Sequence, residues 1–368
     1  MSIKIPFRKT TIPSSLAQAV QAGIATESFS ASEALEADAA NRHGASYALA
    51  TSSSTSALHL AMCALDLKRG DKVLCSINSF VDVPEVVRHF DAEPVFVDTL
   101  PGSYALDPEK LKAAAEKIQG KKLRAVIVGH PGGHRAPMEA IRDVADTYEL
   151  KVIEDATERV GAKDVGQFSD MAVIGFGSKV DNTIDGGILL TDTEAYYHRG
   201  KLLRNHGMIY TSEETTYLYD VLDIGCQYRM QEFNALYCRA LFDETEATLA
   251  RRRAIAETYF RELKSVQNVT LPPQKKDHFY TQFIIEIGTN RDGFARKLKE
   301  VGIEVGLQYI PLNFTQYYKE KYHLKVFDFP AALEAYQKMM SLPIYPQMHD
   351  DEVAYVCKAI REIAASHR

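Results

Sequence analysis

The sequence predicts an α/β protein, with a mostly parallel sheet in its larger part and a smaller α+β part at its C-terminal end. Two observations lead to this fold class. Between about residues 45 and 190, short β-branched and apolar runs alternate with helical stretches, a pattern typical of a parallel sheet covered by helices. In addition, a chain of 368 residues is too long for one small core and indicates two domains or three.

The larger part contains seven runs that we expect to be strands. The first is followed by Ser54, Thr55 and Ser56, whose hydroxyl groups can cap a helix, and by apolar residues at helical spacing. We therefore expect a helix directly after the first strand. In chain order, the predicted strands are YALA, KVLCSI, PVFVD, RAVIVGH, KVIEDA, MAVIGF and GGILLTD.

A helical stretch at about residues 231–263 is rich in helix formers and leads away from the sheet. We take it as the connection between a large domain of residues 1–240, which includes an N-terminal arm, and a small domain of residues 241–368. No Gly/Ser linker separates them, so the two domains should pack together. In the small domain we expect strands at 278–288 and 303–309 and helices at 291–302 and 350–366.

Composition argues against several classes of partner. The formal net charge of -6 provides no attraction to nucleic acid or to an anionic membrane. No apolar run approaches the roughly 20 residues that span a bilayer, and the first residues lack the apolar core of a signal peptide. The five cysteines are scattered and form no CxxC pair, which argues against a disulfide framework or a zinc knuckle. We expect a cytoplasmic protein without a bound metal.

Two segments place polar groups where strands of the predicted sheet end. In ATSSSTSALHLAM, hydroxyl residues at a helix start could form an anion site, or they could simply cap the helix. In KVIEDATERVGA, Glu154 and Asp155 end a strand at the carboxyl edge, where open α/β sheets bind ligands. A carboxylate there could bind magnesium, a ribose hydroxyl or a protonated ring nitrogen, or it could cap the following segment.

The stretch GFGSKVDNTIDGG carries Lys179 on a turn after another predicted strand, so that Lys179 and Asp155 could face one cleft. A phosphate-binding P-loop is excluded, because that loop needs Gly-Lys-Ser/Thr at the start of a helix and here Ser178 precedes the lysine. The lysine is therefore either a solvated charge or a Schiff-base nucleophile. Gly186 and Gly187 are expected to form a tight turn.

Two more features lie near the same carboxyl edge of the predicted sheet. Phe80 follows a strand and could stack on a planar cofactor or pack in the core. His130 and His134 could suggest a metal, but the residues between them, Pro-Gly-Gly, break any helix that would align the two rings. A phosphate site, an aromatic ring, a carboxylate and a lysine together are the parts that hold pyridoxal phosphate (PLP).

The chain resembles the DegT/DnrJ/EryC1/StrS family of sugar aminotransferases, which are fold-type I PLP enzymes, and the resemblance runs nearly end to end. SSSTSALHLAM is similar to the family's SGTAALHLAL, VIEDATERVGA to EDAAQAHGA, and MAVIGFGSKVDNTIDGG to AVFSFYPTKNLTTGEGG. PVFVDTLPGSYALDPEKL, LLRNHGM, GCQYRM and SLPIYP match further family landmarks. The resemblance implies a large domain with a seven-stranded, mostly parallel sheet and a small C-terminal α+β domain.

The resemblance also implies roles for individual residues. Lys179 would form the Schiff base, Asp155 would contact the ring nitrogen, and Glu158, where many members have Gln or His, would lie near the ring's 3-hydroxyl. Gly175 stands where the family has a phosphate-binding serine, so the phosphate would depend more on Ser178 and the helix start. The residues implied to bind the cofactor are Ser54, Thr55, Phe80, Asp155, Glu158, Ser178, Lys179 and Gln227.

In the same way, the resemblance points to a homodimer with shared active sites and to candidate substrate residues. Gln227 replaces an asparagine that, in the family, reaches the cofactor phosphate of the neighbouring subunit. The family's His-Tyr-x-Pro-x-His motif corresponds here to Gln308, Tyr309, Pro311 and Asn313, with both histidines replaced by amides. Tyr309, Asn313 and Arg229 are the candidate substrate residues.

The implied reaction is a ping-pong transamination through a Lys179 aldimine, with pyridoxamine phosphate as the intermediate form of the cofactor. Glutamate would be the amino donor, and a keto-sugar, linked to a nucleotide, the acceptor. Two alternatives are the family's deoxysugar dehydratase branch, against which Lys179 argues because a histidine replaces the lysine there, and a non-catalytic regulatory relative. A Rossmann oxidoreductase is disfavoured, since no GxGxxG follows the first strand. The sequence does not identify the sugar.

Overall fold

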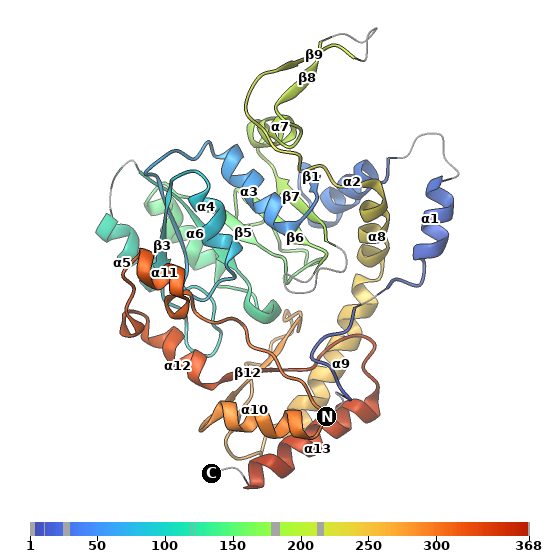
Figure 1. Ribbon diagram of the computed structural model, residues 1–368, viewed down its shortest axis with the longest axis vertical. Helices are drawn as coiled ribbons and strands as arrows, with labels where there is room; N and C mark the ends of the chain where they lie inside the picture. The colour runs from blue at the N-terminus through green and yellow to red at the C-terminus, as the bar shows by residue number, and fades with distance from the viewer. Residues whose placement is uncertain are drawn as a thin grey trace.

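The computed structural model describes residues 4–10, 12–24, 30–118, 120, 122–177, 185–211 and 217–366. Figure 1 shows a sheet-containing part and, below it, a C-terminal part drawn in orange and red. The N-terminus lies beside the C-terminal part. No helix in the described ranges is both long and apolar enough to span a membrane.

The larger part is built on a seven-stranded sheet with the strand order β1-β7-β6-β5-β4-β2-β3. β7 runs antiparallel to both of its neighbours, and the other pairings in the sheet are parallel. The prediction of a mostly parallel sheet of seven strands is therefore confirmed. The strands are β1 (Tyr47–Thr51), β2 (Lys72–Ser76), β3 (Glu93–Val97), β4 (Leu123–Gly129), β5 (Lys151–Asp155), β6 (Met171–Gly175) and β7 (Gly187–Thr191).

Helices cover both faces of this sheet because its central strands are apolar on both sides. Along β4, Ala125 and Ile127 pack into one hydrophobic cluster, while Val126 and Val128 pack into another on the opposite face. The first face carries α3 (Ser54–Ala64), α4 (Asp82–Arg88) and α7 (Glu194–Leu203). The other carries α2 (Ala31–His43), α5 (Pro108–Ile118), α6 (Met138–Thr147) and α8 (Glu232–Asp243), with α1 (Leu16–Ile24) beside α8.

The C-terminal part has its own core around a three-stranded antiparallel sheet, β10-β11-β12. Ile5 is buried in this core and pairs with Ile303, so the N-terminal segment crosses to the C-terminal part. The elements are α9 (Thr245–Leu263), β10 (Val269–Thr270), β11 (Phe283–Ile287), α10 (Arg291–Glu300), α11 (Gln316–Lys321), α12 (Pro330–Lys338), β12 (Met339–Leu342) and α13 (Asp350–Ser366). Short 3-10 turns occur at η1 (Pro131–Gly133), η2 (Leu312–Phe314) and η3 (Val326–Asp328).

The helical stretch at 231–263, expected to be one or two long helices, is two helices, α8 and α9, that meet at Glu244. Two other expectations are corrected by the structure. The expected strand at 278–288 begins only at Phe283. The expected strand at 303–309 is wrong: its backbone makes one bridge to Ile5 and another to Ser341, and is thus divided between two partners instead of pairing along one. The third strand of the small sheet is β12, which the sequence analysis did not predict.

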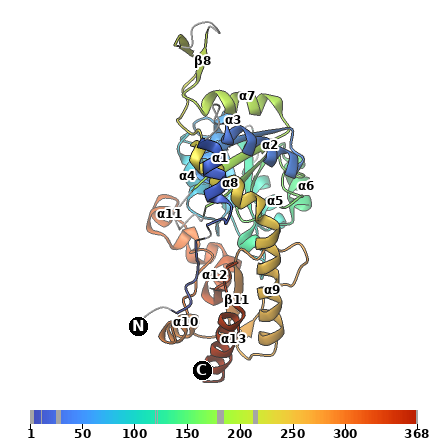
Figure 2. The same ribbon diagram turned by 90° about the vertical axis from the view of Figure 1, so that its right-hand side faces the viewer.

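A two-stranded hairpin of β8 (Met208–Tyr210) and β9 (Tyr219–Val221) was also not predicted. It projects away from the sheet in both views (Figures 1 and 2). Several of its apolar and aromatic side chains are exposed, among them Tyr210, Tyr217, Tyr219 and Val221. Such a hairpin is marginal on its own in water, and its exposed apolar surface is of the kind that associates with another protein surface.

Candidate active site

A pocket lies where the strands of the large sheet end. Because β2, β4 and β5 are parallel neighbours, Ser76, Gly129 and Asp155 come together at one edge. Segment 308–309 of the C-terminal part closes the pocket. The lining residues are Ser76, Asn78, Ser79, Phe80, Val83, Tyr104, Leu106, Ile127, Gly129, His130, Pro131, Asp155, Thr157, Glu158, Gln308 and Tyr309.

Asp155 is the last residue of β5 and is only 7% exposed. Its Oδ1 accepts hydrogen bonds from the Thr157 hydroxyl at 2.7 Å and from the Thr157 backbone N–H at 3.2 Å. This turn fixes the carboxylate at the sheet edge. Beside it, Gly129 pairs with Asp155 in the sheet, and a Cβ built on this glycine would meet no atom within 4 Å. The carboxylate therefore adjoins open space.

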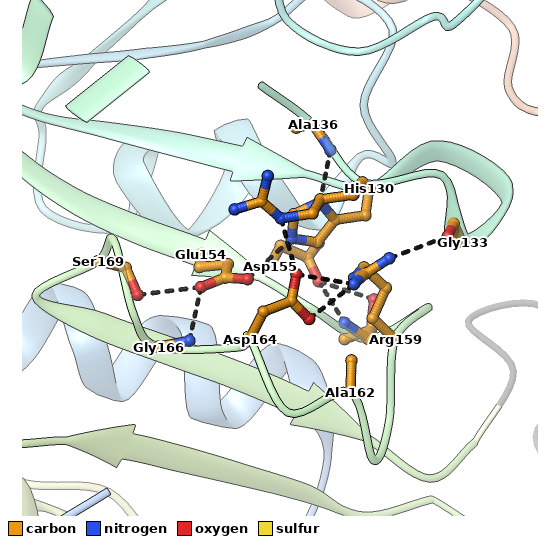
Figure 3. A network of polar contacts seen from close by, with 12 residues as sticks. His130, Gly133, Ala136, Glu154, Asp155, Arg159, Ala162, Asp164, Gly166 and Ser169 are labelled. Carbon is orange, nitrogen blue, oxygen red and sulfur yellow. Dashed lines mark hydrogen bonds and ion pairs between the residues drawn. The ribbon is translucent and has the colours of Figure 1, made fainter. Parts of the chain in front are cut away.

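The neighbouring Glu154 points to the other face of the sheet, since successive side chains of a strand alternate. Figure 3 shows it in a buried network, in which its Oε1 lies 2.9 Å from His130 Nε2 and its Oε2 accepts from the Gly166 N–H at 2.9 Å and the Ser169 hydroxyl at 3.1 Å. The Ala136 N–H donates to His130 Nδ1 at 3.0 Å. His130 is therefore the neutral tautomer that donates from Nε2, and Glu154 has a structural role.

Glu158 connects the sheet edge to the C-terminal part. Its Oε2 accepts from the Gly132 N–H at 2.7 Å and from Gln308 Nε2 at 2.9 Å, and its Oε1 accepts from Gln282 Nε2 at 3.3 Å. Glu158 also interacts electrostatically with Arg252 of α9. Burial lowers the pKa of the Arg252 guanidinium to about 10, and the charge of Glu158 opposes this shift by raising the pKa. These N–H donors stabilise a carboxylate at position 158. They explain how a glutamate can stand where the family pattern has Gln or His.

Gln308 and Tyr309 form the wall opposite Asp155. The Gln308 amide donates to Glu158 from Nε2, because a carboxylate accepts hydrogen bonds. Its Oε1 has no hydrogen-bond partner among the described residues, although Gln308 is only 1% exposed. The Gln308 carbonyl accepts from Asn78 Nδ2 at 3.2 Å. The rings of Tyr309 and Phe80 lie with centroids 5.4 Å apart. Phe80 also lines the pocket, and its stacking on a cofactor stays a prediction.

The start of α3 differs in detail from the prediction. The N-cap is Ser53, whose hydroxyl accepts from the Ser56 N–H at 2.9 Å, so the capping role proposed for Ser54, Thr55 and Ser56 is wrong by at least one position. Thr55 donates its hydroxyl to Asp82 at 3.1 Å. Ser54 is left as the first helical residue, 8% exposed and without a side-chain hydrogen bond among the described residues.

The tight-turn interpretation of Gly186 and Gly187 is replaced by one of close packing. A Cβ on Gly187 would lie 2.4 Å from the Ser53 carbonyl oxygen and 2.7 Å from the Ser54 Cα. Since backbone atoms cannot move aside, only glycine fits at the start of β7. The same contact brings the start of α3 against the ends of β6 and β7.

The remaining predicted residues fall in three places. Ser178 and Lys179 lie outside the described residues. Gln227 and Arg229 have exposed side chains and do not line the pocket; their backbones bridge to Asn205 and Thr51. Asn313 does not line it either: it is buried, and its Nδ2 donates to the Lys325 carbonyl at 3.4 Å.

Several supporting residues were not identified from the sequence. Arg159 Nη2 donates to both carboxylate oxygens of Asp164, at 2.7 and 2.9 Å (Figure 3). Its Nη1 donates to the Asp277 carbonyl at 2.9 Å. It thereby holds the loop after Asp155 against the C-terminal part. Thr157 could have been identified from the sequence, because a hydroxyl two residues after an aspartate often forms this type of turn. Asn78 could not, since its hydrogen-bond partner is a backbone carbonyl 230 residues away.

The fold and this pocket together define an α/β protein with a candidate ligand site at the carboxyl edge of its sheet. Residues 8–361 match the model of the DegT/DnrJ/EryC1/StrS aminotransferase family. The chain therefore belongs to this family, and the predicted family and enzyme class are confirmed.

Individual relatives agree with this assignment. The spore coat polysaccharide biosynthesis protein SpsC of Bacillus subtilis is 31% identical, over 87% of this chain and 86% of its own. The GDP-perosamine synthase of Escherichia coli O157:H7 is 29% identical, over 88% of this chain and 87% of its own. A Bacillus subtilis protein solved with bound pyridoxamine phosphate superposes with a TM-score of 0.85 at 22% identity, over 99% of this chain and 88% of its own. This last likeness shows the fold alone; with the family match, it confirms the predicted fold class and the family's dependence on PLP.

Proposed function

We propose that this chain uses PLP to transfer an amino group from L-glutamate to a nucleotide-linked keto-sugar by a ping-pong mechanism. The observation that carries the proposal is the buried Asp155 carboxylate, held by Thr157 at the sheet edge beside open space. Membership of an aminotransferase family gives the reaction class. The relative named as a GDP-perosamine synthase supports a nucleotide-linked sugar as the acceptor.

The described residues fit this cofactor. A buried carboxylate suits a protonated ring nitrogen, and Phe80 offers an aromatic surface at the pocket rim. The free space next to Gly129 allows a flat ring to approach the sheet edge. Ser54 is 8% exposed, and its hydroxyl makes no hydrogen bond among the described residues. At the start of α3 this hydroxyl suits a phosphate group, because the first N–H groups of a helix also lack helical partners.

Each residue would have a defined task in the reaction. Bound PLP supplies a ring that accepts electrons from the substrate carbon. Asp155 would keep the ring nitrogen protonated, since a neighbouring negative charge raises the pKa of a cation. Phe80 would cover one face of the ring. The Nζ of Lys179, a role assigned from the sequence, would take the proton from the substrate carbon and return it in the second half of the reaction.

Glu158, Gln308 and Tyr309 would form the acceptor side of the pocket. Gln308 lines the pocket and has a buried acceptor oxygen with no partner in the described part of the chain, and Tyr309 adds a phenol. Sugar hydroxyl groups are donors that match such an oxygen. Asn313 and Arg229 do not line this pocket, so we assign the acceptor side to Gln308 and Tyr309.

We also propose a homodimer in which the β8–β9 hairpin packs on a second copy of the chain. Its exposed apolar residues, together with Leu222 and with Ile224 at 93% exposure, support this arrangement. Gln227 is exposed and lies in the segment after β9, where it would reach the site of the second copy. Light scattering of the purified protein should give twice the mass of one chain, and I224D should shift that mass toward a single chain.

The absorbance spectrum tests the cofactor assignment. Purified protein mixed with PLP should show a visible band that borohydride reduction abolishes. The K179A variant should fold with an unchanged melting curve and lack the band. A wild type without this band, or a K179A variant that retains it, contradicts the proposal.

A further inference from the structure

Ser54 and Gly175 occupy one shared space at the edge of the sheet. Gly175 is the last residue of β6, and Ser54 is the first residue of α3. A Cβ built on Gly175 would lie 2.9 Å from the Ser54 Cβ, 3.4 Å from the Ser54 hydroxyl oxygen and 3.1 Å from the Thr157 Cγ2. Neither β-carbon can move freely, because both are attached to packed backbone. Only one of the two positions can therefore carry a side chain.

The serine that occupies this space differs from its neighbours in its hydrogen bonding. The Ser56 hydroxyl bonds to the hydroxyl groups of Ser52 and Ser53, and Thr55 donates to Asp82. By contrast, the Ser54 hydroxyl makes no hydrogen bond among the described residues, although the residue is 92% buried. Its oxygen remains accessible at the start of α3, where the first N–H groups also lack helical partners, so it can bond to an anion there.

The family patterns quoted above differ at both positions. The pattern SGTAALHLAL has glycine where this chain has Ser54, and AVFSFYPTK has serine where it has Gly175. Each replacement alone would leave either a steric clash or an unfilled space between the helix start and the strand end. Together, the two replacements conserve one β-carbon and one hydroxyl in the shared space.

We propose that the two replacements are a single compensated exchange, in which Ser54 has taken over the phosphate-binding hydroxyl from the end of β6. The exchange places that hydroxyl on the same helix terminus whose first N–H groups face the anion, so one element provides both kinds of donor. This inference rests on the proposed use of PLP. It also makes Gly175 obligatory in this chain, as long as Ser54 is present.

A double-mutant cycle of four chains tests the exchange: the wild type, G175S, S54G and S54G/G175S. The melting temperature of each chain without cofactor reports the packing. The dissociation constants for PLP and for pyridoxal, which lacks the phosphate, report the hydroxyl. We expect G175S to melt several degrees below the wild type and the double variant to recover most of that loss. Because Thr157 also lies close to position 175, the cycle is repeated with T157S, which keeps the hydroxyl bonded to Asp155.

For the ligands, S54G should bind PLP about 10- to 100-fold more weakly than the wild type, as expected for a lost hydrogen bond to a charged group. Its affinity for pyridoxal should not change, and the double variant should regain PLP affinity. A G175S chain as stable as the wild type, or a double variant no better than G175S, would overturn the exchange. An S54G chain that loses affinity for PLP and pyridoxal equally would overturn the phosphate contact. A wild type that binds no PLP at all would instead refute the proposed function and, with it, the phosphate role of Ser54. In that case the melting temperatures would still show whether the side chains at positions 54 and 175 exclude each other.

Discussion

The two walls of the pocket are held in place by different means. On the sheet-edge wall, Asp155 and Gly129 are positioned by parallel strand pairing and by the turn at Thr157. On the opposite wall, Gln308 and Tyr309 come from an irregular segment that depends on contacts with Glu158, Asn78 and Phe80. A wall fixed by a sheet suits the invariable chemistry of a cofactor, and a wall fixed by individual side chains can be altered to fit a particular substrate.

The largest effect is expected on the sheet-edge wall. D155N keeps the size of the side chain but removes its charge, so the proton on the cofactor's ring nitrogen would lose its stabilising partner. We expect the rate of amino transfer to fall by about 100- to 1,000-fold, similar to the loss of one preorganised electrostatic contact. Stopped-flow absorbance after mixing with glutamate measures this rate.

A matched control lies at the other end of the neighbouring strand. Asp170 precedes β6 and bonds to Arg142 and Lys151, both at 2.9 Å, far along the sheet from the pocket edge. D170N should lower the melting temperature and leave the rate nearly unchanged. If D155N kept the wild-type rate, the role of the sheet edge in catalysis would be refuted.

An intermediate effect is expected where the two walls meet. The variants E158Q, Q308A and E158Q/Q308A form a cycle around the 2.9 Å hydrogen bond between these residues. Because it joins an amide to a carboxylate, we expect a coupling free energy of about 1–2 kcal/mol in urea unfolding. Q308A should also raise KM for the sugar acceptor and leave the reaction with glutamate nearly unchanged.

Asn313 provides the control for this cycle. It is an equally buried amide, but it bonds to the Lys325 carbonyl and not to Glu158. The effects of E158Q and N313A on stability should therefore add. Equal coupling in both cycles would mean that Glu158 acts through general destabilisation and not through its contact with Gln308.

The smallest effect concerns pH and the same contact between the two parts of the molecule. His134 after η1 stacks on His278, with ring centroids 5.4 Å apart, and burial lowers the pKa of His134 to about 4 and that of His278 to about 3. An unfolded histidine titrates near 6.5, so between these values the unfolded chain binds more protons than the folded one. The free energy of unfolding should therefore fall as the pH falls.

Between pH 7 and pH 6, each of these two histidines should contribute a loss of about 0.7 kcal/mol. H134F keeps an aromatic ring at the stack and removes one titrating group, so it should reduce the pH dependence of urea unfolding by about that amount. His134 makes no side-chain hydrogen bond among the described residues, which limits other effects. An unchanged pH dependence in H134F would show that this histidine is not kept neutral by burial.

The sheet-edge wall could be predicted from the sequence because its signals are local. Apolar runs located the strands, and the residue at a strand end in a parallel sheet must lie at the ligand edge, which placed Asp155 and Phe80. The same pattern also placed Glu154 at this edge, but Glu154 precedes Asp155 within β5, and alternation turns its side chain to the opposite face.

The other wall could not be predicted in the same way. The segment at 303–309 looks like a strand, yet its backbone bonds are divided between Ile5 and Ser341, partners that are distant in sequence. The reason for Gly175 was equally hidden, because the atoms that exclude a side chain there belong to Ser54 and Thr157. Such constraints arise from tertiary contacts and leave no periodic signal in the chain.

The most direct test of the central claim is a single half-reaction. Protein loaded with PLP is mixed with L-glutamate in the absence of any acceptor, and both the visible absorbance band and the released 2-oxoglutarate are measured. We expect the band to disappear and one 2-oxoglutarate to be released for each active site, after which a keto-sugar nucleotide should restore the band. A stable band without 2-oxoglutarate release from glutamate or any other amino acid would contradict transamination and favour a non-catalytic relative of the family.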